Sequence, residues 1–175
     1  MNHLENLIGE WYEYQGYVVR RNVKVGKLSH GGWEGELDVV AYHPRTHHLL
    51  HIEPSIDAYT WTKRQQRFEK KFRAGRKYIK KVVFPWLGPE IHLEQWAVIL
   101  GSDKTHKLIG GGKVVLVRNL IQQITNDIRA AGAMERNAVP ELYPLLRTIQ
   151  FFVRWGAMTP NSQIERETRK SSARR

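Results

Sequence analysis

Two acidic side chains inside apolar stretches are the clearest candidates for chemistry in this sequence. Asp38 lies in ELDVV and Glu53 lies in LLHIE, and both stretches have the composition of strands joined by the turn HPRTH at residues 43–47. If His43 pairs with His48 across that turn, paired residue numbers sum to 91 and Asp38 faces Glu53. A shift of one residue would separate the two acids.

Opposed residues of an antiparallel pair have Cβ atoms about 4.5–5.5 Å apart, and like charges at that distance repel. Two partly buried carboxylates therefore need a cation or a shared proton. A magnesium ion, which proteins bind through one or two carboxylates together with water and phosphate oxygens, would satisfy both acids. The alternative is that one acid points to solvent at its strand end or pairs with a nearby arginine.

The surrounding elements predict an α/β fold with one mixed five-stranded sheet flanked by helices. Strands are indicated over residues 17–25, 36–42, 48–53, 95–100 and 113–117, and the glycine-rich stretch 26–35 is expected to be a loop. Helices are indicated over residues 3–14, 62–83, 119–131 and 140–155, the last with a regular start at Pro140 or Pro144. We expect a single domain over residues 1–160 and a disordered basic tail over residues 161–175.

The charge of the chain indicates a polyanionic partner. Its 175 residues include 28 Lys and Arg against 17 Asp and Glu, which gives a net charge of +11. Residues 63–81 alone hold ten basic side chains and one acid, on a predicted helix whose Phe68 and Phe72 belong to its buried stripe. The alternative is a basic protein that has no such partner.

Several classes of protein are excluded by composition. The chain has no cysteine, which rules out a disulfide-stapled scaffold, a thiolate metal site and a cysteine nucleophile. No apolar stretch is long enough to span a bilayer, and the first residues lack the basic start of a signal peptide. We therefore expect a cytoplasmic protein with no membrane partner. His47 and His48 could bind zinc, but a surface cluster is the stronger interpretation.

The pattern GELDVVAY…HLLHIEPS, preceded by a helix with Glu10 and followed by a basic helix, resembles the PD-(D/E)XK nuclease superfamily, which has the restriction-endonuclease-like fold. The resemblance covers about residues 3–131 in the order of elements. It implies phosphodiester hydrolysis, with Mg or Mn held by Asp38 and Glu53 and an auxiliary acid at Glu10. A divalent ion in such a site polarises the phosphate and lowers the pKa of a bound water.

The sequence departs from that family at the lysine position, two residues after the second acid, which is Ser55. Some members place this lysine on a neighbouring element, so Lys63 and Arg64 are candidates, and helical phase favours Arg64 and Gln65 over Lys63. The candidate catalytic side chains are Asp38, Glu53, Glu10, Ser55 and Gln65. The candidate nucleic-acid-binding side chains are Lys63, Arg64, Arg67, Lys70, Lys71 and Arg73.

The leading interpretation is a metal-dependent endonuclease that hydrolyses phosphodiester bonds in DNA, with a homodimer as a candidate assembly. The alternative is a catalytically inactive, nuclease-like module for nucleic-acid binding or assembly, which Ser55 favours and the retained acid pair opposes. A basic protein–protein adaptor is a third interpretation, and it leaves the acid pair unexplained. Trp33 and Trp61, in or next to loops, are candidates for base stacking, with packing as the alternative.

Overall fold

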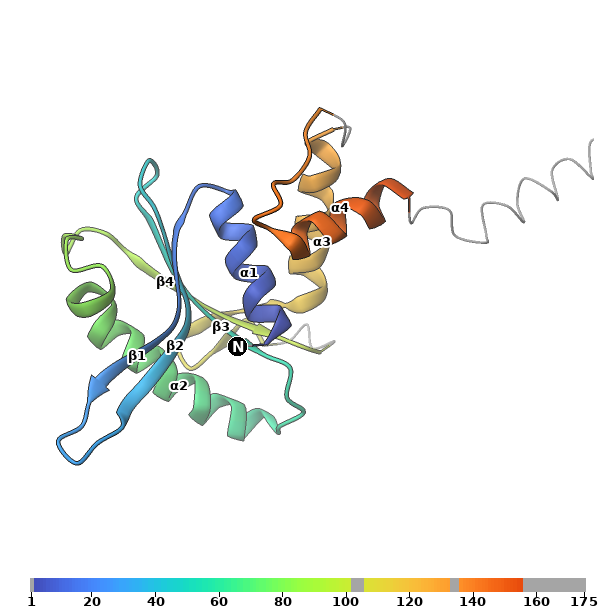
Figure 1. Ribbon diagram of the computed structural model, residues 1–175. Helices are drawn as coiled ribbons and strands as arrows, with labels where there is room; N and C mark the ends of the chain where they lie inside the picture. Colours follow the sequence, from blue (N-terminus) through green and yellow to red (C-terminus); the bar gives the residue numbers. More distant parts are fainter. Residues whose placement is uncertain (1, 102–105, 133–135, 156–175) are drawn as a thin grey trace, which may run out of the picture. The chain divides into compact units, whose positions relative to one another are not determined.

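The computed structural model describes residues 2–101, 106–132 and 136–155, and it has the α/β class predicted from the sequence (Figure 1). Its helical elements are α1 (His3–Tyr14), α2 (Trp61–Tyr78), the π-helical turn η1 (Ile79–Val83), α3 (Val117–Ala130) and α4 (Pro144–Trp155). Its strands are β1 (Val18–Lys27), β2 (Trp33–His43), β3 (His48–Ser55), β4 (Leu93–Ile99), β5 (Leu108–Ile109) and β6 (Gly112–Leu116). The predicted tail over residues 161–175 lies outside the described residues.

Contacts divide the chain into two compact units, residues 1–122 and 123–175, and α3 runs across the division. The first unit contains the whole sheet together with α1 and α2. In the second unit, Gln150 of α4 accepts a hydrogen bond from Val139 N at 2.9 Å, which fixes the segment before that helix. The predicted single domain over residues 1–160 stays a prediction. None of the described helices combines the length and apolarity that a membrane crossing requires.

The sheet is mixed and open, with the strand order β1-β2-β3-β4-β6-β5. β1, β2 and β3 form an antiparallel meander, β3, β4 and β6 run parallel, and β5 is antiparallel to β6. The predicted number of five strands is therefore wrong, because the sheet has six. The strand that was missed, β5, has two residues, which are too few to show the alternation of a strand.

Other boundaries differ where tertiary contacts extend or interrupt an element. The predicted loop over residues 26–35 is shorter, because β1 and β2 stay paired as far as Lys27 and Trp33. The helix predicted over residues 62–83 ends at Tyr78, and its last residues form the wider turn η1. Of the two starts predicted for the last helix, Pro144 is the one observed.

The helices α1 and α2 cover opposite faces of the sheet. Tyr12 of α1 has its ring centroid 6.5 Å from that of Trp96 in β4. Gln95, the preceding residue of β4, donates instead to the Phe72 carbonyl of α2 at 3.0 Å. Because consecutive strand residues point to opposite faces, these two contacts separate the α1 face from the α2 face.

α2 approaches the sheet most closely at Gly75. A Cβ at this position would lie 2.2 Å from His51 Nδ1 and 2.9 Å from Gln95 Nε2, so only glycine leaves room for both side chains. Phe72 and Phe68, one and two turns earlier, are buried and hold the same side of the helix against the sheet. The close approach brings the inward side chains of α2 within reach of β2 and β3.

Gly75→Ala should destabilise the protein, although alanine favours a helix over glycine by about 1 kcal/mol. The new methyl group would overlap His51 and Gln95, and overpacking of a core costs about 1–3 kcal/mol. Denaturant unfolding should therefore show a net loss on the order of 1 kcal/mol. Lys70→Ala, on the exposed side of α2, should leave stability close to that of the wild type. A Gly75→Ala variant as stable as the wild type would contradict the close approach.

Candidate active site

The β2–β3 hairpin brings the two predicted acids together. Its register runs from His43↔His48 to Val39↔Ile52, so paired residue numbers sum to 91 as predicted. At the next position Asp38 N donates to Glu53 Oε1 at 3.3 Å. Both side chains are buried, Glu53 completely. The sequence prediction that Asp38 and Glu53 lie side by side is confirmed.

A break in the β1–β2 ladder shapes the position of Asp38. Arg21↔Val39 and Val23↔Leu37 are paired, but the residues between them, Asn22 and Asp38, are not. Asn22 has φ +54°, in the left-handed region that asparagine tolerates better than most residues. The break leaves Asp38 N–H outside the ladder, where it donates to Glu53.

The same break changes which face of the sheet the β2 side chains occupy. Leu37 and Val40 belong to one buried cluster together with Ala74 of α2. In a regular strand two residues three positions apart point to opposite faces. Here Leu37, Asp38 and Val40 all lie on the α2 side, because the strand turns at the unpaired residue. Asp38 thereby faces the basic helix.

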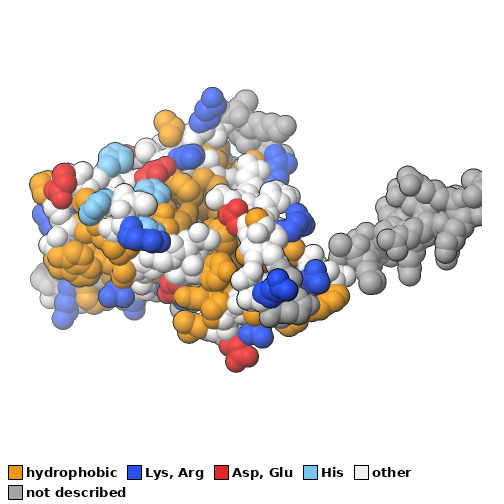
Figure 2. Space-filling model, turned by 90° about the horizontal axis from the view of Figure 1, so that it is seen from above, with side chains coloured by type: hydrophobic (Ala, Val, Ile, Leu, Met, Phe, Trp, Pro, Cys, Tyr) orange, Lys and Arg blue, Asp and Glu red, His pale blue; other side chains and the backbone are white. Residues whose placement is uncertain are grey.

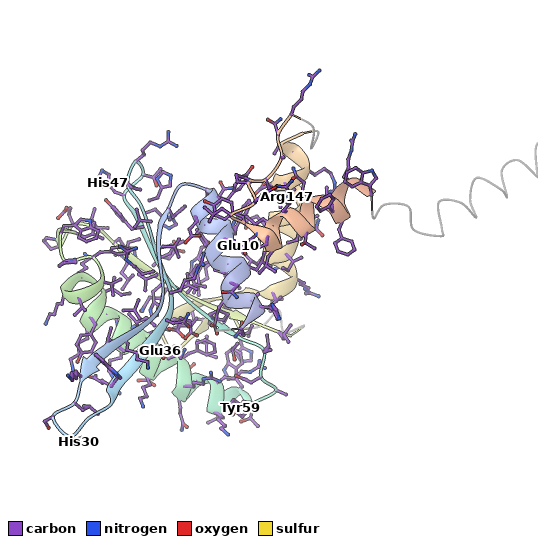
Figure 3. The ribbon with its side chains drawn as sticks, in the orientation of Figure 1. Glu10, His30, Glu36, His47, Tyr59 and Arg147 are labelled. Atoms are coloured by element: carbon purple, nitrogen blue, oxygen red, sulfur yellow. The ribbon has the colours of Figure 1, made fainter. Side chains whose placement is uncertain are left out.

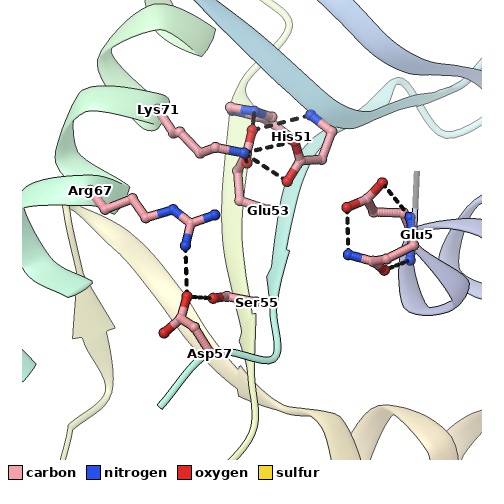
Figure 4. A network of polar contacts seen from close by, with 9 residues as sticks. Glu5, His51, Glu53, Ser55, Asp57, Arg67 and Lys71 are labelled. Carbon is pink, nitrogen blue, oxygen red and sulfur yellow. Dashed lines mark hydrogen bonds and ion pairs between the residues drawn. The ribbon is translucent and has the colours of Figure 1, made fainter. Parts of the chain in front are cut away.

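Lys71 of α2 lies between the two carboxylates (Figure 4). Its Nζ is 2.7 Å from each carboxylate oxygen of Asp38 and also donates to Glu53 Oε2. From the sequence alone, Lys71 is one of the predicted nucleic-acid-binding residues, and Lys63 and Arg64 are the predicted replacements for the family lysine. A usable signal was helical phase, because Lys71 follows Phe68 by three positions and directly precedes Phe72.

A chain of hydrogen bonds behind Glu53 fixes its carboxylate. Arg76 Nη1 donates to Gln95 Oε1 at 2.7 Å, so the Gln95 amide nitrogen is left to donate to the Phe72 carbonyl and to His51 Nδ1, both at 3.0 Å. His51 Nδ1 therefore accepts, and its Nε2–H donates to Glu53 Oε1 at 2.7 Å. These bonds hold the His51 ring in one orientation, and the ring in turn orients Glu53, as supporting residues do around metal-binding carboxylates.

The two acids differ in the ease with which they ionise. Burial raises the pKa of Glu53, but the hydrogen bond from His51 and the positive charge of Lys71 outweigh it and hold the pKa at about 2. Burial and the neighbouring charge of Glu53 raise the pKa of Asp38 to about 8, against the opposing effect of Lys71. One ammonium group therefore does not fully compensate two carboxylates, and an additional positive charge fits the pair.

Ser55, at the family's lysine position, faces a neighbouring ion cluster. Its Oγ donates to Asp57 Oδ2. Asp57 also accepts from Arg67 Nη1 at 2.7 Å (Figure 4). A second arginine, Arg64, donates to it through Nε at 3.3 Å. Ser55, the last residue of β3, and Arg64 of α2 were both proposed from the sequence, and both bind Asp57. The cation at the acid pair comes from Lys71 instead.

The structure does not bring the other predicted residues to the acid pair. Gln65 Oε1 accepts from Gly110 N at 3.0 Å and so ties α2 to the turn before β6. Lys63 Nζ lies over the Tyr59 ring, 3.9 Å from its centroid. Glu10 is buried on α1, which covers the face of the sheet opposite α2 (Figure 3). Lys70 and Arg73 are exposed on the outer side of α2.

The histidines at the β2–β3 turn lie at the other end of the hairpin from Glu53. His48 Nδ1 is bonded to Tyr17 Oη at 2.8 Å and its Nε2 to Glu94 at 3.1 Å. His47 Nδ1 is bonded to Tyr42 Oη at 2.9 Å. Histidine side chains gather on the face drawn in Figure 2. Within the described ranges, no three His, Asp or Glu side chains are grouped closely enough to hold one metal ion.

Comparisons with family models, with curated proteins and with solved structures gave no match to this chain.

Asn22→Val should displace Asp38, because a β-branched side chain does not tolerate the left-handed backbone at φ +54°. Asn22→Gly, which accepts that conformation, is the matched control. We expect Asn22→Val to lose about 1–3 kcal/mol of unfolding free energy and Asn22→Gly to lose much less. Denaturant unfolding measures both. Equal losses in the two variants would show that the ladder break does not depend on this residue.

Asp38→Asn should stabilise the metal-free protein at alkaline pH. The pKa of Asp38 is about 8 in the folded protein against an ordinary value of 3.8. The stability that this raised pKa contributes is therefore complete below about pH 4 and is lost as the pH rises through about pH 8. Above pH 8 we expect the Asp38→Asn variant to gain roughly 1–3 kcal/mol over the wild type. Unfolding in EDTA from pH 5 to 9 tests this, and a gain that does not grow with pH contradicts it.

Proposed function

We propose that this protein is a metal-dependent nuclease that hydrolyses phosphodiester bonds in DNA, on a restriction-endonuclease-like fold. The observation that carries the proposal is the convergence of Asp38, Glu53 and Lys71 on one face of the sheet. Two carboxylates and a lysine are the functional groups of the PD-(D/E)XK motif, here with the lysine on α2. The mixed sheet between α1 and α2 agrees with that fold.

A divalent metal fits the acid pair on the chemistry of its donors. Asp38 and Glu53 are buried, adjacent and only partly compensated by Lys71, as the raised pKa of Asp38 reflects. Oxygen donors of this kind suit Mg²⁺ or Mn²⁺, which need few protein ligands because phosphate oxygens and water complete the shell. When bound, such an ion polarises the scissile phosphate and lowers the pKa of a water molecule.

The side chains of the site then have distinct roles in the proposed reaction. Glu53 and Asp38 would hold the ion. His51 keeps the Glu53 carboxylate in one orientation through a 2.7 Å hydrogen bond. Lys71 supplies the positive charge that offsets negative charge developing on the phosphate, which is the part of the reaction a protein most effectively stabilises. Its position on a helix, rather than two residues after Glu53, leaves that charge within reach of both acids.

The outer side of α2 is suited to the nucleic-acid backbone. Lys63, Arg67, Lys70 and Arg73 are exposed along it, and Lys71 lies inward on the same helix. Lysine and arginine contacts to phosphates position a protein on nucleic acid without selecting a sequence, and the affinity falls steeply with salt. A strand bound along α2 would thus lie beside the acid pair.

The alternative is an inactive, nuclease-like module for nucleic-acid binding or assembly. Two observations favour it: Ser55 replaces the family lysine and is engaged with Asp57, and Lys71 by itself provides a counter-charge for the acid pair. In that case Lys71 would be a permanent structural cation, and added metal would leave the protein unchanged.

Cleavage of labelled DNA in Mg²⁺ or Mn²⁺ distinguishes the two functions. We expect activity that EDTA abolishes and that Asp38→Ala removes. Lys71→Met should lower the activity roughly 100-fold or more, because it removes the positive charge that stabilises the negative charge of the transition state. Lys70→Met, which removes a neighbouring exposed charge, should retain most of the activity. DNA binding by Lys71→Met should stay within a few-fold of the wild type.

Binding without cleavage, together with a melting temperature that Mg²⁺ does not change, would favour the inactive module. Equal activity of Lys71→Met and Lys70→Met would show that Lys71 is not the replacement for the motif lysine, even if the protein proves to be a nuclease.

A further inference from the structure

A pocket lies at the outer edge of β6, next to the start of α3. Its volume is about 470 Å³, and its wall includes Lys107, Lys113 and Arg118 together with apolar Val114 and Leu116. β5 pairs with Gly112 and Lys113 of β6, and the carbonyl of Lys107, just before β5, accepts a hydrogen bond from Val114 N at 2.9 Å.

Three basic side chains line the pocket, and one of them, Lys113, is already engaged: its Nζ lies 5.1 Å from the centroid of the Trp96 ring, and its charge lowers the pKa of Glu94. None of its lining residues is Asp or Glu, and α3 has no acidic residue in its first turn. Among the described residues, no carboxylate forms an ion pair with Lys107 or Arg118. The start of α3 is the positive end of that helix and adds to the same field. A negatively charged ligand is therefore the chemistry that the pocket favours.

Aromatic rings border this pocket. His106, which contributes to its wall, is stacked on Trp61 with ring centroids 3.9 Å apart and planes at 28°. Tyr59, two residues before Trp61, is 43% exposed at the start of α2 (Figure 3). Lys63 Nζ lies over its ring. Flat rings beside cations are the combination with which proteins bind unpaired bases and their phosphates.

The pocket also lies close to the acid pair. Glu53 is paired with Ala97 of β4, and Ala97 is paired with Val114 of β6. Val114 is thus two strands away from Glu53 at the same level of the sheet, about 10 Å at the usual spacing between strands. Val114 also packs with Phe68 and Phe72 of α2, which places it on the face that carries Glu53. The pocket and the acid pair thus lie about 10 Å apart on the same face of the sheet, with Phe68 and Phe72 of α2 packed over the residues between them.

We propose that the pocket and the neighbouring rings bind a single-stranded segment of nucleic acid. Phosphates bind at Lys107, Lys113 and Arg118, and unpaired bases stack on Tyr59 and on the Trp61–His106 pair. A paired base has its faces covered by its neighbours in the duplex, so stacking on a side chain requires a single strand. This inference rests on the proposed function and specifies its substrate class as nucleic acid with a single-stranded part.

Binding in EDTA tests the inference separately from catalysis. Fluorescence anisotropy of the full chain would compare a labelled single-stranded DNA, the RNA of the same sequence and the matching duplex. We expect Lys107→Ala/Arg118→Ala to weaken single-strand binding at least tenfold and Tyr59→Ala to weaken it about fivefold or more. Duplex binding should change less than twofold in both variants. The DNA and RNA arms identify the sugar that is preferred.

Matched variants control for charge and for exposed aromatic area. Lys24→Ala/Lys81→Ala removes two exposed lysines from other parts of the first unit, and Trp86→Ala removes a tryptophan that is 63% exposed. Both should preserve the preference for the single strand. Thermal unfolding should show that the Tyr59 and Lys107/Arg118 variants are folded, because all three side chains are exposed.

Equal loss of single-strand and duplex binding in the pocket variants would overturn the inference, and so would unchanged single-strand binding. Displacement of the oligonucleotide by submillimolar inorganic phosphate would also overturn it, because the pocket would then bind an isolated anion. Single-strand binding that depends on the pocket, in a protein that does not cleave, would uphold this inference while the proposed nuclease activity fails. Cleavage that Asp38→Ala removes and that the pocket variants leave unchanged would support the nuclease activity and contradict this inference.

Discussion

The interaction on which the site depends is the repulsion between two buried carboxylates. Asp38 and Glu53 lie side by side because the β2–β3 register places them there, and water is largely excluded from both. Such a pair persists in a folded protein only with positive charge beside it or with one of the two acids protonated. The ammonium of Lys71 meets that need from α2. The close approach of α2 to the sheet at Gly75 therefore serves the electrostatics of the site as well as its packing.

The two acids are held in different ways, which gives them different chemistry. Glu53 is fixed from behind by the sequence of bonds from Arg76 through Gln95 and His51, so its carboxylate stays ionised and immobile. Asp38 stands at a break in the β1–β2 ladder and has the raised pKa of the pair. The site therefore combines a fixed, ionised carboxylate with a second carboxyl group whose pKa is about 8.

Local patterns of the sequence predict much of this arrangement, and tertiary contacts account for the rest. The turn between His43 and His48 fixes the register, so the position of Glu53 opposite Asp38 follows from counting. The role of Lys71 depends on which side of α2 contacts the sheet. The sequence does not single it out, because α2 carries eight basic residues. The ladder break at Asn22 leaves no signal, because a single asparagine is compatible with a regular strand as well.

Two opposing effects act on α2: repulsion between its exposed basic side chains and packing of its apolar side against the sheet. Its exposed lysines and arginines repel one another and weaken the isolated helix, since like charges one turn apart are destabilising. Packing must compensate, and it does so along the opposite side, where Phe68 and Phe72 are buried. Lys71 lies on the boundary between these two sides, half-buried, with its charge committed to the acid pair. The stability of the helix and the charge of the site are consequently coupled: a change that loosens α2 from the sheet also withdraws the cation from Asp38 and Glu53.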